Sequence, residues 1–361
     1  MRKRVFVSVF WLCVGLGLFV GLALDAQEPV NSNSHIRVVV DLVQLNIAVT
    51  DSRGNYVTGL QPSDFVVTED GIPQKISTFA EGNAPARRLA DAPLNAKDVN
   101  AAPVDGQQSD RGLDGTHLTT AELSSIAAGA NVFVLFDTSD YMYRGFVFAQ
   151  DAISDFVRSL ESADRIAFYS YSRDLSRAAR LTADRSAVLR GVRTTVAGDD
   201  AALYNCLLLT LKDAGQFSGR KVVVVFSNGP DNASVVPPED VAELAQSTGT
   251  AIYMICTREA QLEPISTAVF ERMTAATGGK AYFAKSWKEE KRAFASIRED
   301  LAHLYSLSYY PQQNPNRGWR SITVKLTSDR LKRCHLRTRN GYRLQPTRFA
   351  KADTEAEADP Q

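Results

Sequence analysis

The hydrophobic pattern of the chain changes twice, and each change marks a different kind of predicted structure. In residues 36–49 apolar side chains recur at mostly two-residue spacing, and the same alternation returns in 65–69 and 74–79. This is the period of a β-strand with one buried face. Asp70-Gly71, between the last two runs, is typical of a two-residue hairpin turn. We therefore predict an all-β unit at residues 27–80.

A second pattern, in which short apolar runs alternate with helical periodicity, fills residues 129–304. Unbroken Val, Ile, Leu and Phe runs are typical of strands buried on both faces. The alternation predicts the α/β class, with a doubly wound, mostly parallel sheet and helices on both faces. The first helix carries Phe148, Ile153, Phe156 and Val157 on its apolar side. We expect strands at 131–137, 165–171, 176–181, 221–226, 251–256 and 281–284, and helices at 145–160, 185–194, 202–214, 238–246, 265–276 and 289–304.

Strand alternation returns in residues 305–345, where we expect three further strands. We interpret Tyr309-Tyr310-Pro311 as a strand edge and turn. We predict that these strands pair with the N-terminal ones in a β-sandwich-like unit of about seven strands, which would make the α/β domain an insertion between its halves. Residues 81–128 lack apolar periodicity and are predicted to be a linker, and the acidic residues 346–361 a disordered tail.

The N-terminus predicts export. Arg2, Lys3 and Arg4 precede an uncharged apolar run at residues 5–24, which is the pattern of a secretory signal peptide. Cleavage after Ala26 would remove residues 1–26. The run is also long enough to remain as a signal anchor. We expect a secreted, periplasmic or cell-envelope location, with membrane contact only if this segment is not cleaved.

Composition narrows the function classes. Lys and Arg number 41, as do Asp and Glu, so bulk charge favours neither nucleic acid nor an anionic membrane as a partner. Cys206, Cys256 and Cys334 are too few for a disulfide-stapled secreted domain. The chain has no CxxC pair, no GxSxG elbow and no glycine-rich phosphate loop. We therefore predict a protein without enzymatic activity.

Candidate chemistry follows the apolar strand at 131–137, whose sequence continues as DTSD. In parallel sheets the ligand crevice lies at the carboxyl ends of the strands. Asp137, Thr138, Ser139 and Asp140 are therefore expected there. Their hard oxygen atoms are of the type that Mg²⁺ prefers.

This run resembles the first strand and metal-ion-dependent adhesion site of a von Willebrand factor A domain. The family pattern is Asp-x-Ser-x-Ser, followed by a distant Thr and a distant Asp. Asp137 and Ser139 match it, whereas Tyr141 stands at the second serine, Ala201 at the threonine and Asn228 at the last aspartate. The resemblance therefore implies the family fold with a degenerate site, of which Asp137 and Ser139 are the remnant.

Nearby carboxylates leave an alternative open. In one interpretation, Asp231 with Asp200 or Asp199 replaces the missing ligands in a weak Mg²⁺ or Ca²⁺ site. The other interpretation is that these are solvated loop acids. If the site is degenerate and these acids are solvated, we expect no cofactor. If the acids replace the missing ligands, we expect a weakly bound Mg²⁺ or Ca²⁺ ion.

A second resemblance covers the N-terminal unit. The stretch VTDSRGNYVTGLQPSDFVVTEDGIPQKISTF resembles the start of a bacterial group of VWFA-related domain proteins that is well represented in Acidobacteria. That group pairs a V-T-D-x-x-G-x-x-V-x-x-L segment with D-F-x-x-x-E-D-G-x-x-Q-x-I-x-x-F. An A domain follows both here and in the group.

The resemblance implies a binding or scaffold module that holds a protein partner on the top face of the A domain. Because the metal site is degenerate, we expect surface complementarity to carry the contact. Two alternatives are a metal-dependent adhesion module with altered ligands and a structural envelope component that associates with itself. The predicted partner-binding residues are Asp140, Tyr141, Met142, Tyr143 and Asn228.

Overall fold

The computed structural model describes residues 42–89, 129–160, 164–257 and 264–344. The predicted signal segment, most of the predicted linker and the acidic tail lie outside these residues. So do the first residues of the strand expected from position 36. No helix in the described part of the chain combines the length and the apolar character needed to cross a membrane.

A six-stranded sheet forms the centre of the α/β domain, in the order β11-β10-β9-β6-β7-β8. All pairings are parallel except that of the edge strand β8, which runs antiparallel to β7. The central strand is buried along its whole length because its apolar run is covered on both faces. The strands are β6 (Ala130–Asp137), β7 (Arg165–Tyr171), β8 (Leu175–Thr182), β9 (Arg220–Ser227), β10 (Thr250–Cys256) and β11 (Ala281–Phe283).

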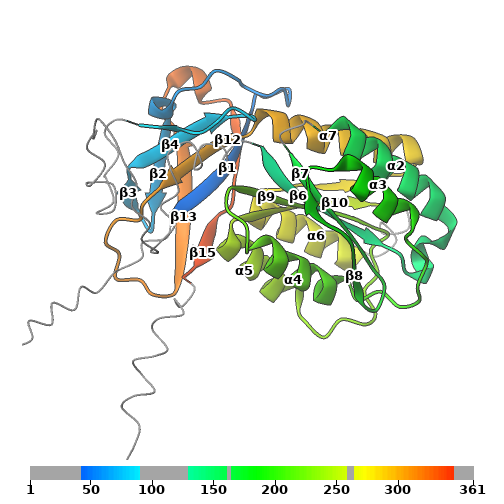
Figure 1. The fold of residues 1–361 in the computed structure, drawn as a ribbon. Helices are drawn as coiled ribbons and strands as arrows, with labels where there is room; N and C mark the ends of the chain where they lie inside the picture. Colours follow the sequence, from blue (N-terminus) through cyan, green and yellow to red (C-terminus); the bar gives the residue numbers. More distant parts are fainter. Residues whose placement is uncertain (1–41, 90–128, 161–163, 258–263, 345–361) are drawn as a thin grey trace, which may run out of the picture. The chain divides into compact units, whose positions relative to one another are not determined.

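Helices cover both faces of this sheet, as the strand–helix alternation predicted (Figure 1). One apolar cluster joins the sheet to α2 (Phe146–Ser159), α3 (Arg185–Arg193) and α7 (Trp287–His303). The other joins it to α4 (Leu203–Ala214), α5 (Pro238–Thr248) and α6 (Pro264–Thr277). A short 3₁₀ segment, η2 (Asp140–Gly145), connects β6 to α2.

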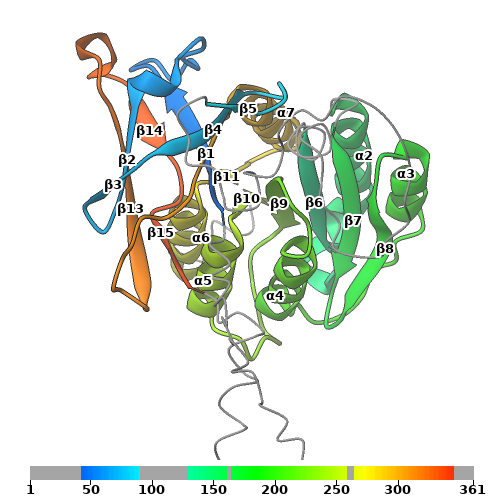
Figure 2. The same cartoon turned by 60° about the vertical axis from the view of Figure 1, so that its left-hand side comes forward.

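Strands from the two ends of the chain form two further sheets, with orders β14-β1-β12-β4-β5 and β15-β13-β2-β3 (Figure 2). One apolar cluster takes residues from both, which confirms the sandwich-like unit. Because β1 pairs with β12 and β2 with β13, the α/β domain is inserted between paired strands. The bounds are β1 (Val43–Thr50), β2 (Phe65–Glu69), β3 (Ile72–Gln74), β4 (Ile76–Glu81), β5 (Arg87–Arg88), β12 (Tyr305–Tyr309), β13 (Trp319–Leu326), β14 (His335–Arg337) and β15 (Gly341–Arg343), with 3₁₀ turns η1 (Pro62–Asp64) and η4 (Asp329–Leu331).

Local details of the sandwich test the sequence predictions. Glu69 pairs with Ile72 across Asp70-Gly71, both at positive φ, so the predicted two-residue hairpin is confirmed. Strand β5 falls within the residues predicted as a linker. The interpretation of Tyr309 as an edge residue is wrong: β12 lies between β1 and β4, and the Tyr309 side chain is buried with its hydroxyl donating to Glu69.

One buried carboxylate links the sandwich strands to the α/β domain. Asp300 of α7 accepts hydrogen bonds from the hydroxyls of Tyr253 in β10 and Tyr56, each at 2.7 Å. Arg337 of β14 forms an ion pair with the same carboxylate. Two residues beyond α7, the chain enters β12 at the centre of its sheet. Helix α7 is therefore connected to the sandwich in two ways, by the side-chain contacts of Asp300 and by the chain that continues into β12.

Candidate functional site

Asp137 ends β6 with its carboxylate fully buried. Oδ1 accepts hydrogen bonds from the backbone N–H of Ser139 at 2.9 Å and from the Ser139 hydroxyl at 2.7 Å. Oδ2 accepts one from the hydroxyl of Ser227, the last residue of the neighbouring strand β9, at 2.7 Å. Both carboxylate oxygens are therefore satisfied by the protein itself, which is the ordinary requirement for a buried charge.

A second layer of hydrogen bonds orients the Ser227 hydroxyl. Its oxygen accepts from the Tyr171 hydroxyl at 3.2 Å and from the backbone N–H of Gly229 at 3.0 Å. The Ser227 proton is thereby directed to Asp137. Burial raises the pKa of Asp137, and the hydrogen bonds from Ser227 and Ser139 oppose that rise.

The remaining positions of the adhesion-site pattern offer poor ligands for Mg²⁺. Tyr141 is half-exposed, and Ala201 is buried and carries only a methyl group. Asn228 is also buried, and its Oδ1 has no hydrogen-bond partner among the described residues. Among those residues, no group of three or more His, Cys, Asp and Glu side chains is placed to hold a metal ion. One carboxylate and two hydroxyls already bonded to it do not fit the oxygen-rich shell of Mg²⁺.

The acids expected to replace the missing ligands have structural contacts of their own. Asp231 accepts from the backbone N–H groups of Tyr204, at the start of α4, and Ser234, at 3.0 and 2.9 Å. Asp200 accepts from the side chain of Asn232 at 3.2 Å and lies 3.7 Å from the guanidinium of Arg173. These contacts hold loops together, and a role for either acid in metal binding stays a prediction.

Of the predicted partner-binding residues, two are not accessible. Met142 is only 2% exposed, because the η2 turn directs its side chain into the core beneath α2, so its expected exposure is wrong. Asn228 is likewise buried, since it directly follows strand β9, and a role for it in binding a partner stays a prediction. Asp140 is exposed, and its backbone N–H donates to Asp199 at 2.9 Å.

Large apolar side chains are nevertheless exposed directly after the Asp137 site. Tyr141 and Tyr143 are 46% and 76% exposed, and Val147 and Phe148 are 65% and 62% exposed. We call these four residues the apolar rim. Phe148 was expected on the buried side of α2, but that side begins instead with Ala149, Ala152 and Ile153, so this prediction is wrong.

Ser227, Tyr171 and Val147 were not identified from the sequence, and Phe148 was assigned to the core and not to an exposed surface. Ser227 could have been identified from the sequence, because it ends an apolar strand and directly precedes Asn228, where the family pattern has an aspartate. The exposure of Val147 and Phe148 could not have been predicted, since an apolar pair at the start of a helix is equally typical of a core. The Ser139 hydroxyl is fully buried and donates to Asp137, so it is not presented to a substrate as a nucleophile.

Part of the α/β domain is similar to a known family. Residues 132–230 match a family model described as von Willebrand factor type A domain. No curated protein matches the chain significantly. Similar solved structures include BatB from Bacteroides thetaiotaomicron, at 14% identity over 48% of this chain and 98% of that one, with a TM-score of 0.39. The vWF domain of the pilus tip protein Mfa5 from Porphyromonas gingivalis shares 12% identity over 47% and 94%, with a TM-score of 0.40.

A von Willebrand factor type A protein from Catenulispora acidiphila shares 14% identity over 58% of this chain and 65% of that one, with a TM-score of 0.41. Likeness at such identities concerns the fold, and the roles of those proteins do not transfer with it.

Proposed function

We propose that this chain, which contains a von Willebrand factor type A domain, is an exported binding or scaffold protein that holds a protein partner through the apolar rim. The observation that supports this proposal most directly is the exposure of the apolar rim. Its four side chains lie within residues 141–148 and are exposed, whereas single surface apolar residues need no explanation. Tyrosine and phenylalanine are also enriched where proteins bind one another.

The closed Asp137 site supports a contact that does not depend on a metal. A carboxylate that accepts hydrogen bonds from Ser139 and Ser227 on both oxygens already has the partners that a buried charge requires. Its role under the proposal is to fix the turn that follows β6, and so to hold η2 and the rim in place. The site is then a support for the binding surface and does not itself touch the partner.

Export is the second part of the proposal and rests on the N-terminal sequence. Arg2, Lys3 and Arg4 followed by the apolar residues 5–24 form the pattern that a secretion system recognises. A partner is therefore to be sought among envelope or extracellular proteins. Accumulation of the chain in the cytoplasm of its own host, with residues 1–26 intact, would contradict this part.

The test compares a rim variant with a matched control. Tyr143→Ser/Phe148→Ser removes two rim side chains, while Val66→Ser/Leu209→Ser removes two exposed apolar side chains from β2 and α4. Each full-length protein is incubated with envelope proteins of its host, and retained proteins are quantified. We expect the rim variant to lose a retained protein that the wild type and the control both keep. Truncating two interface aromatic residues costs about 2 kcal/mol or more.

Other outcomes separate the alternatives. Retention that is equal in all three proteins would remove the rim from the binding surface. Retention that disappears with a chelator would favour the metal-dependent adhesion module. Concentration-dependent self-association of the wild type, lost in the rim variant and measured by sedimentation, would favour the structural envelope component.

A further inference from the structure

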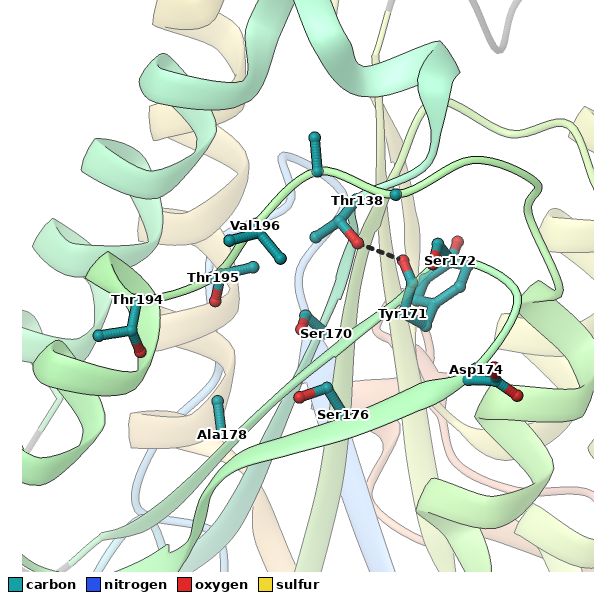
Figure 3. Close-up of a pocket in the computed structure, with 12 residues that line it drawn as sticks. Thr138, Ser170, Tyr171, Ser172, Asp174, Ser176, Ala178, Thr194, Thr195 and Val196 are labelled. Atoms are coloured by element: carbon teal, nitrogen blue, oxygen red, sulfur yellow. Dashed lines mark hydrogen bonds between the residues drawn. The ribbon is translucent and has the colours of Figure 1, made fainter.

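A pocket of about 340 Å³ is lined by Thr138, the residue that follows Asp137 in the chain (Figure 3). Its walls are the end of β7, the turn and first half of β8, and the segment Thr194–Gly198 that follows α3. Backbone hydrogen bonds from Gly198 to Thr138 at 2.7 Å and from Asp140 to Asp199 at 2.9 Å hold that segment over the end of β6. The pocket is thus built from several elements and is separate from the apolar rim.

The strand alternation explains why a pocket forms here. Ile166 and Phe168 of β7 belong to the apolar cluster under α2 and α3, and Ser170 is the next residue on the same face. Helix α3 ends at Arg193, so it does not extend over Ser170. The apolar core therefore ends at Ser170, and a polar cavity begins there. Ser170 lies beside Ser176, its register partner on β8, in the wall of this cavity (Figure 3).

Hydroxyl groups dominate the lining. Those of Thr138, Thr194 and Thr195 donate to backbone carbonyls at 2.8 to 3.2 Å, which leaves their oxygens free to accept. Ser170 is only 6% exposed, and its hydroxyl has no hydrogen-bond partner among the described residues. This hydroxyl faces the pocket, so it is free to donate a hydrogen bond to a polar occupant. The serine and threonine residues of the lining are Thr138, Ser170, Ser172, Ser176, Thr194 and Thr195.

The charged side chains that line the pocket restrict the charge of the ligand that it can bind. Among the described residues that line the pocket there is one carboxylate, Asp174, and no Lys, Arg or His. An anionic ligand would meet no cation here. Ala178 and Val196 add aliphatic surface beside the hydroxyls. The volume is at the lower end of the range for ligand pockets, about 300–1,000 Å³.

We propose that this pocket binds a neutral sugar unit of monosaccharide size. Sugar hydroxyls can donate to the accepting oxygens of Thr138, Thr194 and Thr195 and accept from Ser170, while C–H groups contact Ala178 and Val196. The same chemistry is presented by a free monosaccharide and by the terminal unit of a glycan. The proposal does not depend on the protein partner of the rim.

The experiment is saturation-transfer NMR on the full chain with D-glucose, D-galactose, D-mannose and N-acetylglucosamine, each also as its methyl glycoside and as an oligosaccharide terminus. We expect binding of at least one sugar with a Kd on the order of 1 mM. A signal only from the glycan form would identify the terminal unit as the ligand. Glucuronate, which has a carboxylate in place of the glucose hydroxymethyl group, is expected to bind more weakly than glucose.

Two variants and a control connect the signal to the pocket. Ser170→Ala removes the unpaired hydroxyl, and Ser170→Val also fills space, so binding is expected to weaken in the first and vanish in the second. Ser63→Val, at an exposed position in η1, is expected to bind like the wild type. Circular dichroism and thermal melting establish that each variant is folded. No binding by any sugar, tighter binding of glucuronate than of glucose, or unchanged binding in folded Ser170→Val would overturn the proposal.

Discussion

The hydroxyl of Ser227 donates a hydrogen bond of 2.7 Å to Oδ2 of Asp137, and the two residues end the neighbouring strands β9 and β6. This contact joins the ends of the two central strands of the sheet. It also means that one oxygen of Asp137 depends on a residue distant in sequence, while the other depends on Ser139, two residues away.

The first prediction concerns this pair. Ser227→Ala leaves one oxygen of a buried carboxylate without its hydroxyl donor, so we expect the free energy of unfolding to fall by about 1–3 kcal/mol. Urea denaturation measures the change. Ser63→Ala is the control, since Ser63 is exposed and its side chain bonds to no other residue that the structure describes. Equal stability of the two variants would mean that Ser227 does not support Asp137.

The second prediction concerns metal. Because both oxygens of Asp137 already accept protein hydrogen bonds, calorimetric titration with Mg²⁺, Ca²⁺ and Mn²⁺ is expected to give the same heats for the wild type and Asp137→Asn. Saturable binding in the wild type that Asp137→Asn loses would instead restore the altered metal site. In that case Asp200→Asn and Asp231→Asn would identify its other ligands.

The third prediction concerns the contact between the sandwich and the A domain. Arg337 pairs with the buried carboxylate of Asp300, whereas Arg343 pairs with Glu243 in solvent. Removing one partner of a buried pair costs about 3–5 kcal/mol, and removing an exposed pair costs about 0–1 kcal/mol. Arg337→Met is therefore expected to lower the urea midpoint far more than Arg343→Met. Similar midpoints would show that Asp300 does not depend on Arg337.

The fourth prediction concerns acid stability at the β2–β3 hairpin. Burial opposes ionisation of Asp70, but hydrogen bonds from Asn314, Ser321 and Asn316 outweigh it and lower its pKa from 3.8 to about 2. A carboxyl whose pKa is lower in the folded state contributes stability above pH 3.8 and loses it as pH falls toward 2. The unfolding free energy of the wild type is expected to fall more steeply over that range than that of Asp70→Asn.

NMR titration of the Asp70 carboxyl carbon checks the same shift directly. Asn314→Ala/Asn316→Ala removes two side-chain donors, at 2.9 Å each, and is expected to move the midpoint back toward 3.8. A midpoint that stays near 2 in this variant would assign the shift to Ser321 alone.

The local hydrophobic pattern was sufficient to predict most helices and strands and the position of Asp137, although it did not predict β5. A short apolar run without alternation is typical of a strand covered on both faces, so β6 and the carboxylate at its end could be predicted from the sequence. The Asp70-Gly71 turn followed in the same way, because only a few residue types adopt positive φ at both positions. Pairing of the N- and C-terminal strands could be expected too, since short strands at either end need a common core.

Tertiary packing decided which side chains are exposed to solvent and which hydroxyls lack a hydrogen-bond partner. Whether Phe148 or Ala149 begins the buried side of α2 depends on the angle at which η2 enters the helix, and sequence periodicity does not encode that angle. Met142 is buried between exposed Tyr141 and Tyr143 for the same reason. The Ser227–Asp137 contact and the unpaired hydroxyl of Ser170 likewise arise only when strands and loops distant in sequence are brought together, because hydrogen bonding and burial are properties of the assembled core.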